Sequence, residues 1–363
     1  MGESGKRLSK ILLLSAGCLG FVWASAVSEP QFLRRFQNGL RDLSGIAFTP
    51  DSRTLLTSGG GSSSAWDART GKRLWSLESQ AAGELALSPN ARLVAIDRHS
   101  SAVSYPYIGL YEVRSGQKLL AFKIQNAYYA ARLAWSPNGQ WLAISTGSDV
   151  RLHRTGNGQQ LRILEPVCRA ALSVAWRPAT NELALSCFDG TIELYTVGGT
   201  EYEVLTERKI LGAVQRWMFT HPDRRYTFNS HSLAFSPDGS LIAQVLADRV
   251  TILESLTGVV VKEFTPQVPA APANGSGGFF DNIAWSTDAS MLALTGYKRR
   301  LSLYSASTGE FLRGFGGPST PSAVQFSPDA SMLVTGYGSP EDLFLNAWGS
   351  SDGTAIFTAE KLK

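Results

Sequence analysis

The sequence repeats one phrase seven times, and this repeat limits the possible folds more than any other feature of the chain. Each copy reads as an apolar strand, a Ser-Pro-Asp-Gly-like turn, a second apolar strand, an alternating third strand, a Thr-Gly-like turn and a final strand. The clearest copy runs from Ser232 to Phe264. The other six begin at Gly45, Glu84, Arg132, Ser173, Asn282 and Ala323. One sheet of four short strands cannot bury both of its faces alone, so the copies must pack against one another.

The turn residues indicate tight hairpins. Proline presets φ at the second turn position, and Asp or Asn followed by Gly tolerates the bend. The turn prolines are Pro50, Pro89, Pro137, Pro178, Pro237 and Pro328, with Thr287 in the equivalent place of the sixth copy. A period of about 40–45 residues with four strands is typical of propeller repeats, and the longer intervals in this chain indicate loop insertions. We therefore predict an all-β fold with almost no helix: a seven-bladed β-propeller of four-stranded antiparallel blades over residues 31–361.

The copies resemble those of WD-repeat propellers. The Trp-Asp pair appears once, as Trp66-Asp67, and a turn aspartate before the third strand recurs as Asp149, Asp189 and Asp248. The Gly-His pair typical of that family is absent. The resemblance implies the fold but no particular subfamily, and a propeller fold does not fix a function.

Two segments compete for the place of the last outer strand. Gln31 to Phe36 reads like a final strand, and so does Thr354 to Thr358. We expect the N-terminal strand to help close the ring, because closure across both termini removes an exposed edge.

The first 26 residues differ from the rest and predict export. Lys6, Arg7 and Lys10 precede an uncharged, mostly apolar stretch, 11–26, which ends in Ala24-Ser25-Ala26. This order is typical of a secretory signal cleaved after residue 26. The alternatives are an uncleaved membrane anchor and lipidation of Cys18. We expect a periplasmic or extracellular protein, in contact with a membrane only through residues 11–26 if these are retained.

The cysteines do not form a metal-binding or disulfide pattern. Pairing Trp176 with Leu183 across the hairpin sets Leu172, not Cys168, opposite Cys187. We therefore expect two buried free thiols in the mature chain, with a disulfide as the alternative.

Composition and motifs argue against nucleic-acid binding and catalysis. A net charge of +4 is too balanced to indicate nucleic acid. The four histidines, of which His99 and His221 fall in long inserts, have no metal-ligand spacing. No Gly-rich phosphate loop or nucleophile elbow is present. We expect no catalytic residue, metal or cofactor.

The best functional signal is a set of three long inserts. They span Asp97 to Tyr107, Leu205 to Ser230 and Thr265 to Asp281. All three lie between second and third strands or between blades, so they should emerge on one face, which is how binding faces are built. Their aromatic and Arg residues, together with those of the link before the third blade, are the candidate partner-binding residues. These are Tyr105, Tyr107, Tyr128, Tyr129, Trp217, Phe219, Arg224, Arg225, Tyr226, Phe279 and Phe280. The alternative for each aromatic is that it only pins its loop to the blades.

One segment resembles a different propeller family. Residues 65–75, from Ala65 to Trp75, are similar to the repeat of pyrroloquinoline-quinone propellers, in which the Trp packs between blades. No ligand cluster for that cofactor or its Ca²⁺ is found. The preferred function is thus an exported, monomeric, non-catalytic propeller that binds a protein, or a peptide or glycan, through its insert-bearing face. The alternative is a quinone-dependent or lactonase-like enzyme with its site at the central channel mouth.

Overall fold

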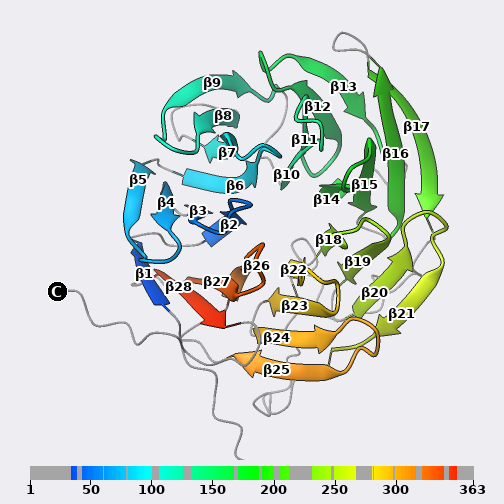
Figure 1. The fold of residues 1–363 in the computed structure, drawn as a ribbon. Helices are drawn as coiled ribbons and strands as arrows, with labels where there is room; N and C mark the ends of the chain where they lie inside the picture. Colours follow the sequence, from blue (N-terminus) through cyan, green and yellow to red (C-terminus); the bar gives the residue numbers. More distant parts are fainter. Residues whose placement is uncertain are drawn as a thin grey trace, which may run out of the picture.

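The protein was analysed as a computed structural model, which describes residues 34–38, 43–59, 61–78, 81–99, 106–125, 132–166, 171–187, 190–199, 204–211, 231–246, 249–266, 280, 282–296, 299–315, 321–338 and 343–349. Within these ranges the chain is all β, and its strands form seven four-stranded antiparallel sheets. Figure 1 shows the sheets arranged radially around a common axis. The fold is an all-β propeller with four-stranded antiparallel blades, as the repeat predicts.

Each blade contributes one strand to each of four concentric positions (Figure 1). The innermost strands are β2 (Leu43–Phe48), β6 (Ala81–Leu87), β10 (Arg132–Trp135), β14 (Ala171–Trp176), β18 (His231–Phe235), β22 (Asn282–Trp285) and β26 (Pro321–Phe326). The second strands are β3 (Thr54–Gly59), β7 (Leu93–His99), β11 (Trp141–Ser145), β15 (Glu182–Cys187), β19 (Leu241–Leu246), β23 (Met291–Gly296) and β27 (Met332–Gly338). The third strands are β4 (Ser62–Asp67), β8 (Tyr107–Glu112), β12 (Val150–Arg154), β16 (Ile192–Gly199), β20 (Arg249–Glu254), β24 (Arg299–Ser305) and β28 (Leu343–Gly349). The outer strands are β5 (Arg73–Glu78), β9 (Lys118–Lys123), β13 (Gln160–Leu164), β17 (Val204–Leu211), β21 (Val260–Phe264), β25 (Phe311–Phe315) and β1 (Arg34–Asn38).

We number the blades 1 to 7, from β2–β5 through to β26–β28 with β1. Each innermost strand contacts the innermost strand of the next blade, and β26 contacts β2 in turn. Seven apolar clusters fill the spaces between neighbouring blades. Second strands are therefore buried almost throughout, whereas outer strands such as β5 alternate between exposed and half-buried side chains.

The N-terminal strand closes the ring. β1 pairs antiparallel with β28, from Arg34 opposite Ala347 to Asn38 opposite Leu343. The expected closure by the N-terminal strand is thus confirmed, with described bounds of 34–38; Thr354 to Thr358 lies outside the described residues. Figure 1 shows this first strand beside the last one.

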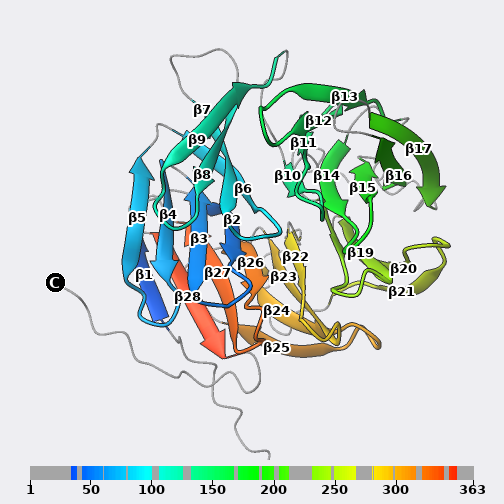
Figure 2. The same ribbon diagram turned by 45° about the horizontal axis from the view of Figure 1, so that its top comes forward.

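Antiparallel pairing gives the ring two different ends (Figure 2). Turns between first and second strands, and between third and fourth strands, lie at one end, which we call the turn end. Links between second and third strands, and between blades, lie at the other, which we call the insert end. In six of the seven described first turns, a Ser or Thr hydroxyl hydrogen-bonds to an Asp or Asn two residues later, as Ser236 does to Asp238.

Tryptophan side chains tie some blades together by hydrogen bonds. Trp135, Trp176 and Trp285 end their innermost strands and donate Nε1–H to a backbone carbonyl of the preceding innermost strand, at 2.9–3.1 Å. Trp75 donates to the carbonyl of Val113 at 2.7 Å and packs over the third turn of the next blade. The packing between blades that the quinone-propeller resemblance implies for this Trp is therefore present.

Among the described residues, no helix is long and apolar enough to cross a membrane. The predicted signal or anchor, residues 1–26, lies outside them.

Candidate functional site at the insert end

Most of the predicted partner-binding residues fall outside the described part of the chain. These are Tyr105, Tyr128, Tyr129, Trp217, Phe219, Arg224, Arg225, Tyr226 and Phe279. Tyr107 and Phe280 are described, and they have different environments. Tyr107 is half-buried at the start of β8, on the insert end.

Phe280 does not belong to an open binding surface. Its side chain is fully buried in the cluster between blades 5 and 6, which also contains Trp285 and Tyr304. For this residue the alternative reading is correct: the aromatic ring pins the end of its insert to the blades.

Two of the three predicted inserts are shorter than expected. Asp97 to His99 continue strand β7, and Tyr107 pairs with Arg98, so the link between the second and third strands of blade 2 spans only 100–106. Val204–Leu211 forms the outer strand of blade 4, so that insert begins after residue 211. In both segments charged residues interrupt the apolar pattern of the strand: Asp97 and Arg98 in β7, and 207–209 in β17.

A polar contact crosses the centre of the ring at the insert end. The guanidinium of Arg132, on β10, donates to Glu84 of β6 at 2.7 Å and to Asn282 of β22 at 3.1 Å. Blades 3 and 6 are not neighbours, so this side chain spans the axis. Arg132 and Glu84 are 23% and 18% exposed, which leaves part of the ion pair open to solvent.

These three residues occupy the same position of the repeat. Counting three residues back from the last residue of each innermost strand gives Gly45, Glu84, Arg132, Ser173, Ser232, Asn282 and Ala323. Only blades 2 and 3 carry a charge there. Sequence reasoning missed the site because it compared loops, whereas aligning the seven first strands position by position would have found it.

A second carboxyl group lies beside this contact. Asp97, on β7, is 1% exposed and sits opposite a β-bulge formed by Gly83 and Glu84. A Cβ on Gly83 would approach Oδ2 of Asp97 to 2.6 Å, so the glycine makes room for the carboxyl group. Burial, and then the negative charge of Glu84, raise the pKa of Asp97 to about 8. Burial also raises the pKa of Glu84, which the Arg132 charge partly opposes.

Asp97 therefore carries a proton at neutral pH, and its position in the repeat explains how the fold accepts it. In each of the other blades, one second-strand residue lies opposite the innermost-strand position that Glu84 occupies in blade 2. These residues are Ser58, Ser145, Ser186, Val245, Thr295 and Gly336. Hydroxyl groups dominate this set, and a protonated carboxyl group can likewise donate a hydrogen bond.

Two buried arginines fix the roots of the links at this end. Arg98 donates to the carbonyl of Glu78 at 2.6 Å and to the hydroxyl of Tyr111 at 2.9 Å. Arg151 donates to the carbonyl of Gln125 and forms an ion pair with Asp149 at 2.9 Å. Both carbonyls belong to the preceding blade, where its outer strand ends.

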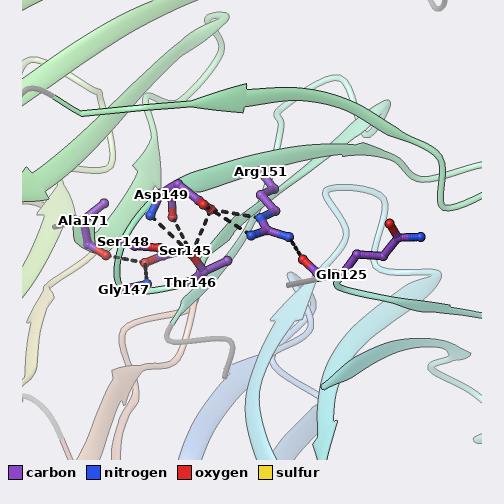
Figure 3. Close-up of polar contacts among 8 residues, drawn as sticks. All are labelled: Gln125, Ser145, Thr146, Gly147, Ser148, Asp149, Arg151 and Ala171. Atoms are coloured by element: carbon purple, nitrogen blue, oxygen red, sulfur yellow. Dashed lines mark hydrogen bonds and ion pairs between the residues drawn. The ribbon is translucent and has the colours of Figure 1, made fainter. Parts of the chain in front are cut away.

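Figure 3 shows the second of these networks. Thr146 donates its hydroxyl hydrogen to Asp149 at 2.8 Å, and Ser145 donates to the carbonyl of Ala171 in blade 4 at 2.5 Å. Asp149, the turn aspartate of the repeat, thus orients Arg151 toward blade 2. These hydrogen bonds join blade 3 to both of its neighbours at the insert end.

The described histidines do not form a metal site. No group of three or more His, Cys, Asp or Glu residues within the described ranges could hold a metal ion. His153 is buried, stacks on Phe122 at 4.8 Å between ring centroids, and shares a hydrogen bond between Nδ1 and the carbonyl of Gly158. Burial lowers its pKa. His99 ends β7, and His221 lies outside the described residues.

Cys187 is disulfide-bonded, so the expectation of free thiols is wrong for this residue. Its partner cysteine lies outside the described residues. The sequence argument failed because β14 contains an irregularity: Ala171, not Leu172, lies opposite Cys187. The buried carboxylate of Glu193 accepts a hydrogen bond from Tyr195 at 2.8 Å beside this cysteine.

Chemically, the insert end of blades 2 and 3 combines a partly exposed guanidinium, an amide and two carboxyl groups whose pKa values are raised. Of these groups, the partly exposed Arg132 guanidinium and Glu84 carboxyl group can exchange hydrogen bonds with a polar side chain or ligand that enters from this end.

Comparison with known proteins gives one relative. Over 197 residues the chain is 27% identical to an uncharacterized WD repeat-containing protein of Deinococcus radiodurans. The matched region covers 52% of this chain and 72% of the relative. No protein-family model matches the sequence.

Proposed function

Because the chain belongs to the WD-repeat β-propeller family, we propose that it is an exported, non-catalytic interaction scaffold that binds a protein partner at its insert end. WD-repeat propellers commonly serve as scaffolds. The seven sheets form the complete ring of blades, and the partner contacts the sector of blades 2 and 3 together with the long link between blades 4 and 5.

One observation carries the choice of this end. Charged residues at the innermost position of the repeat occur only in blades 2 and 3, where Arg132 spans the axis to reach Glu84 and Asn282. A packing role would favour the small residues that other blades use there. Side chains that break a structural repeat on the face that carries the longest links are best explained by recognition.

The disulfide at Cys187 supports export. Disulfides persist in oxidising compartments such as the periplasm and are rare in the cytosol. Together with the basic and apolar leader over residues 6–26, it favours a mature chain that starts at Val27. N-terminal sequencing of the protein from the envelope of its host tests this, and a start at Met1 in the cytosolic fraction contradicts it.

The binding role is tested by capture from the host envelope with the chain from Val27 as bait. The variants are Tyr107→Ala, and Trp217→Ala combined with Arg224→Ala. We expect each to lower the retained partner about tenfold or more, as loss of an interface hot spot does.

The matched control lies at the turn end. Arg92→Ala with Arg114→Ala removes two exposed cationic side chains from the opposite end and should leave capture unchanged. If the control and the insert variants lower capture equally, the insert end is not the binding face.

A second candidate function is favoured by Asp97 alone. A buried carboxyl group that holds its proton near neutral pH is a feature of general acids, and Asp97 lies beside the polar contact at the ring centre. On this hypothesis the propeller is an enzyme with its site at the centre of the insert end. Turnover of any substrate that Asp97→Asn abolishes, with partner capture intact, would favour the enzyme.

A further inference from the structure

The turn end has a charge distribution that the binding role of the insert end does not explain. In the turns of blades 1 and 2, which span 49–54, 67–73, 88–93 and 112–118, seven cationic side chains are all exposed. They are Arg53, Arg69, Lys72, Arg73, Arg92, Arg114 and Lys118. Three acidic residues accompany them, so this sector, which we call the basic sector, has a net charge of +4.

The described turns of blades 5, 6 and 7 have the opposite charge. Residues 236–241, 254–260, 286–291, 305–311 and 327–332 contain no Lys or Arg. Their exposed charges are Asp238, Glu254, Asp288, Glu310 and Asp329, which give this acidic sector a net charge of −5. Hydrogen bonds from Ser236 and Ser240 lower the pKa of Asp238 to about 2, so this charge persists in mildly acidic solution.

Exposed apolar side chains surround the same end. Leu74, Leu119, Leu256, Val259, Val260 and Leu312 are each 48–58% exposed, and all lie in the third turns or in the first residues of the outer strands. These side chains flank the charged turns of blades 1, 2, 5 and 6, so an interface at this end would bury apolar as well as charged groups.

We propose that the turn end binds a second copy of this chain, turn end against turn end. A two-fold axis in the plane of the interface places the basic sector of each copy opposite the acidic sector of the other, so both complementary contacts form at once. An anionic membrane or nucleic acid would attract the basic sector and repel the acidic one. A second copy is the occupant that uses both sectors. This inference rests on the fold and not on the function of the insert end, and it replaces the expectation of a monomer.

The experiment measures molecular mass in solution by light scattering and sedimentation, at about 100 µM of the chain from Val27. All described strands follow residue 33, so this chain keeps the whole ring. We expect a dimer at about 20 mM salt that dissociates at about 500 mM, because salt screens exposed charges. A monomer at low salt overturns the proposal.

Charge exchange in the third turns gives the sharper test. Arg69→Glu with Arg114→Glu neutralises the basic sector, and Glu254→Lys with Glu310→Lys nearly neutralises the acidic one. Each double variant alone should be monomeric. Mixed in equal amounts, the two should form a heterodimer, because the intact acidic sector of one faces the intact basic sector of the other.

The matched control carries the same charge change elsewhere. Lys123→Glu with Arg162→Glu alters two exposed residues on the outer strands, and it should remain a dimer. Failure of the mixture to associate, or loss of the dimer in this control, overturns the proposal. The proposal is also overturned if the protein is a monomer that sediments with vesicles of phosphatidylglycerol but not with vesicles of phosphatidylcholine, because the turn end then binds an anionic membrane. Unchanged thermal unfolding of every variant excludes misfolding as the cause.

Discussion

The two ends of this ring use carboxyl groups in opposite ways. At the turn end, Asp238 is exposed, accepts hydrogen bonds from Ser236 and Ser240, and has a pKa lowered to about 2. At the insert end, Asp97 is buried beside Glu84 and has a pKa raised to about 8. The first kind of aspartate recurs from blade to blade, and the second occurs once. We therefore expect carboxyl groups that recur from blade to blade to stabilise the fold, and a carboxyl group that occurs in one blade only to lower its stability.

The largest effect is expected from the ion pair at the ring centre. Arg132→Ala leaves Glu84 without its cationic partner next to Asp97. We expect a loss of about 2–4 kcal/mol in the free energy of unfolding, somewhat less than for a fully buried pair. Urea unfolding measures it, with Arg162→Ala on the exposed outer strand as the control.

A double variant sharpens the comparison of the two ends. Arg132→Met with Glu84→Gln removes both charges together, and we expect it to lie within about 1 kcal/mol of the unaltered protein. That result means that folding does not require the pair. A loss as large as that of Arg132→Ala means that the contact is structural, and the contrast between the ends then fails.

The next effect concerns Asp97. Asp97→Ser introduces the residue that three other blades place there, and we expect a gain of about 1–3 kcal/mol in the free energy of unfolding at pH 7. An unfolded Asp loses its proton near pH 4, and folded Asp97 loses its proton near pH 8. Between these values the folded state binds the extra proton, so its contribution to stability falls as pH rises and is constant above pH 8.

The measurement is the difference in unfolding free energy between Asp97→Ser and the unaltered protein, from pH 5 to pH 9. It should widen up to about pH 8 and then remain level. A difference that does not depend on pH means that Asp97 is ionised in the folded state.

The corresponding change at the turn end has the opposite sign. Asp238→Ala removes the acceptor of three hydrogen bonds within one turn, and we expect a loss of about 1 kcal/mol at pH 7. Since the folded pKa is lowered, this contribution is present above about pH 4 and disappears as pH falls toward 2. Thermal unfolding at pH 7 and pH 2.5 checks both statements. Ala179→Gly in blade 4, whose turn lacks this Ser–Asp pair, is the control for a general effect of altering a turn.

The contrast also explains what the sequence could predict. Turn residues and strand alternation are local, and they act identically in every copy, so the blade, its four strands and the ring closure by Arg34–Asn38 were all predictable. The contact between Arg132 and Asn282 joins residues 150 positions apart and depends on how blades face one another. The position of Ala171 opposite Cys187 depends on one irregular residue in the strand, which no local pattern indicates.

The smallest effect tests whether the turns themselves are optimal. Each of the seven described first turns has one residue with a positive φ, and in six of them this residue follows the turn Asp or Asn; only Gly139 and Gly239 are glycines. A Cβ on Gly139 would meet only Pro89, at 3.9 Å, so Gly139→Ala introduces backbone strain without a clash. We expect it to cost about 1 kcal/mol.

The reciprocal change, Ala91→Gly at φ 54°, relieves the same strain but adds freedom to the unfolded chain, so we expect a gain of only about 0.5 kcal/mol. Thermal unfolding of both variants measures the pair. If the two variants change the stability in opposite directions, left-handed strain is stored in the five turns that lack glycine at this position. If both change it in the same direction, contacts with neighbouring turns, and not φ, decide the stability of this end.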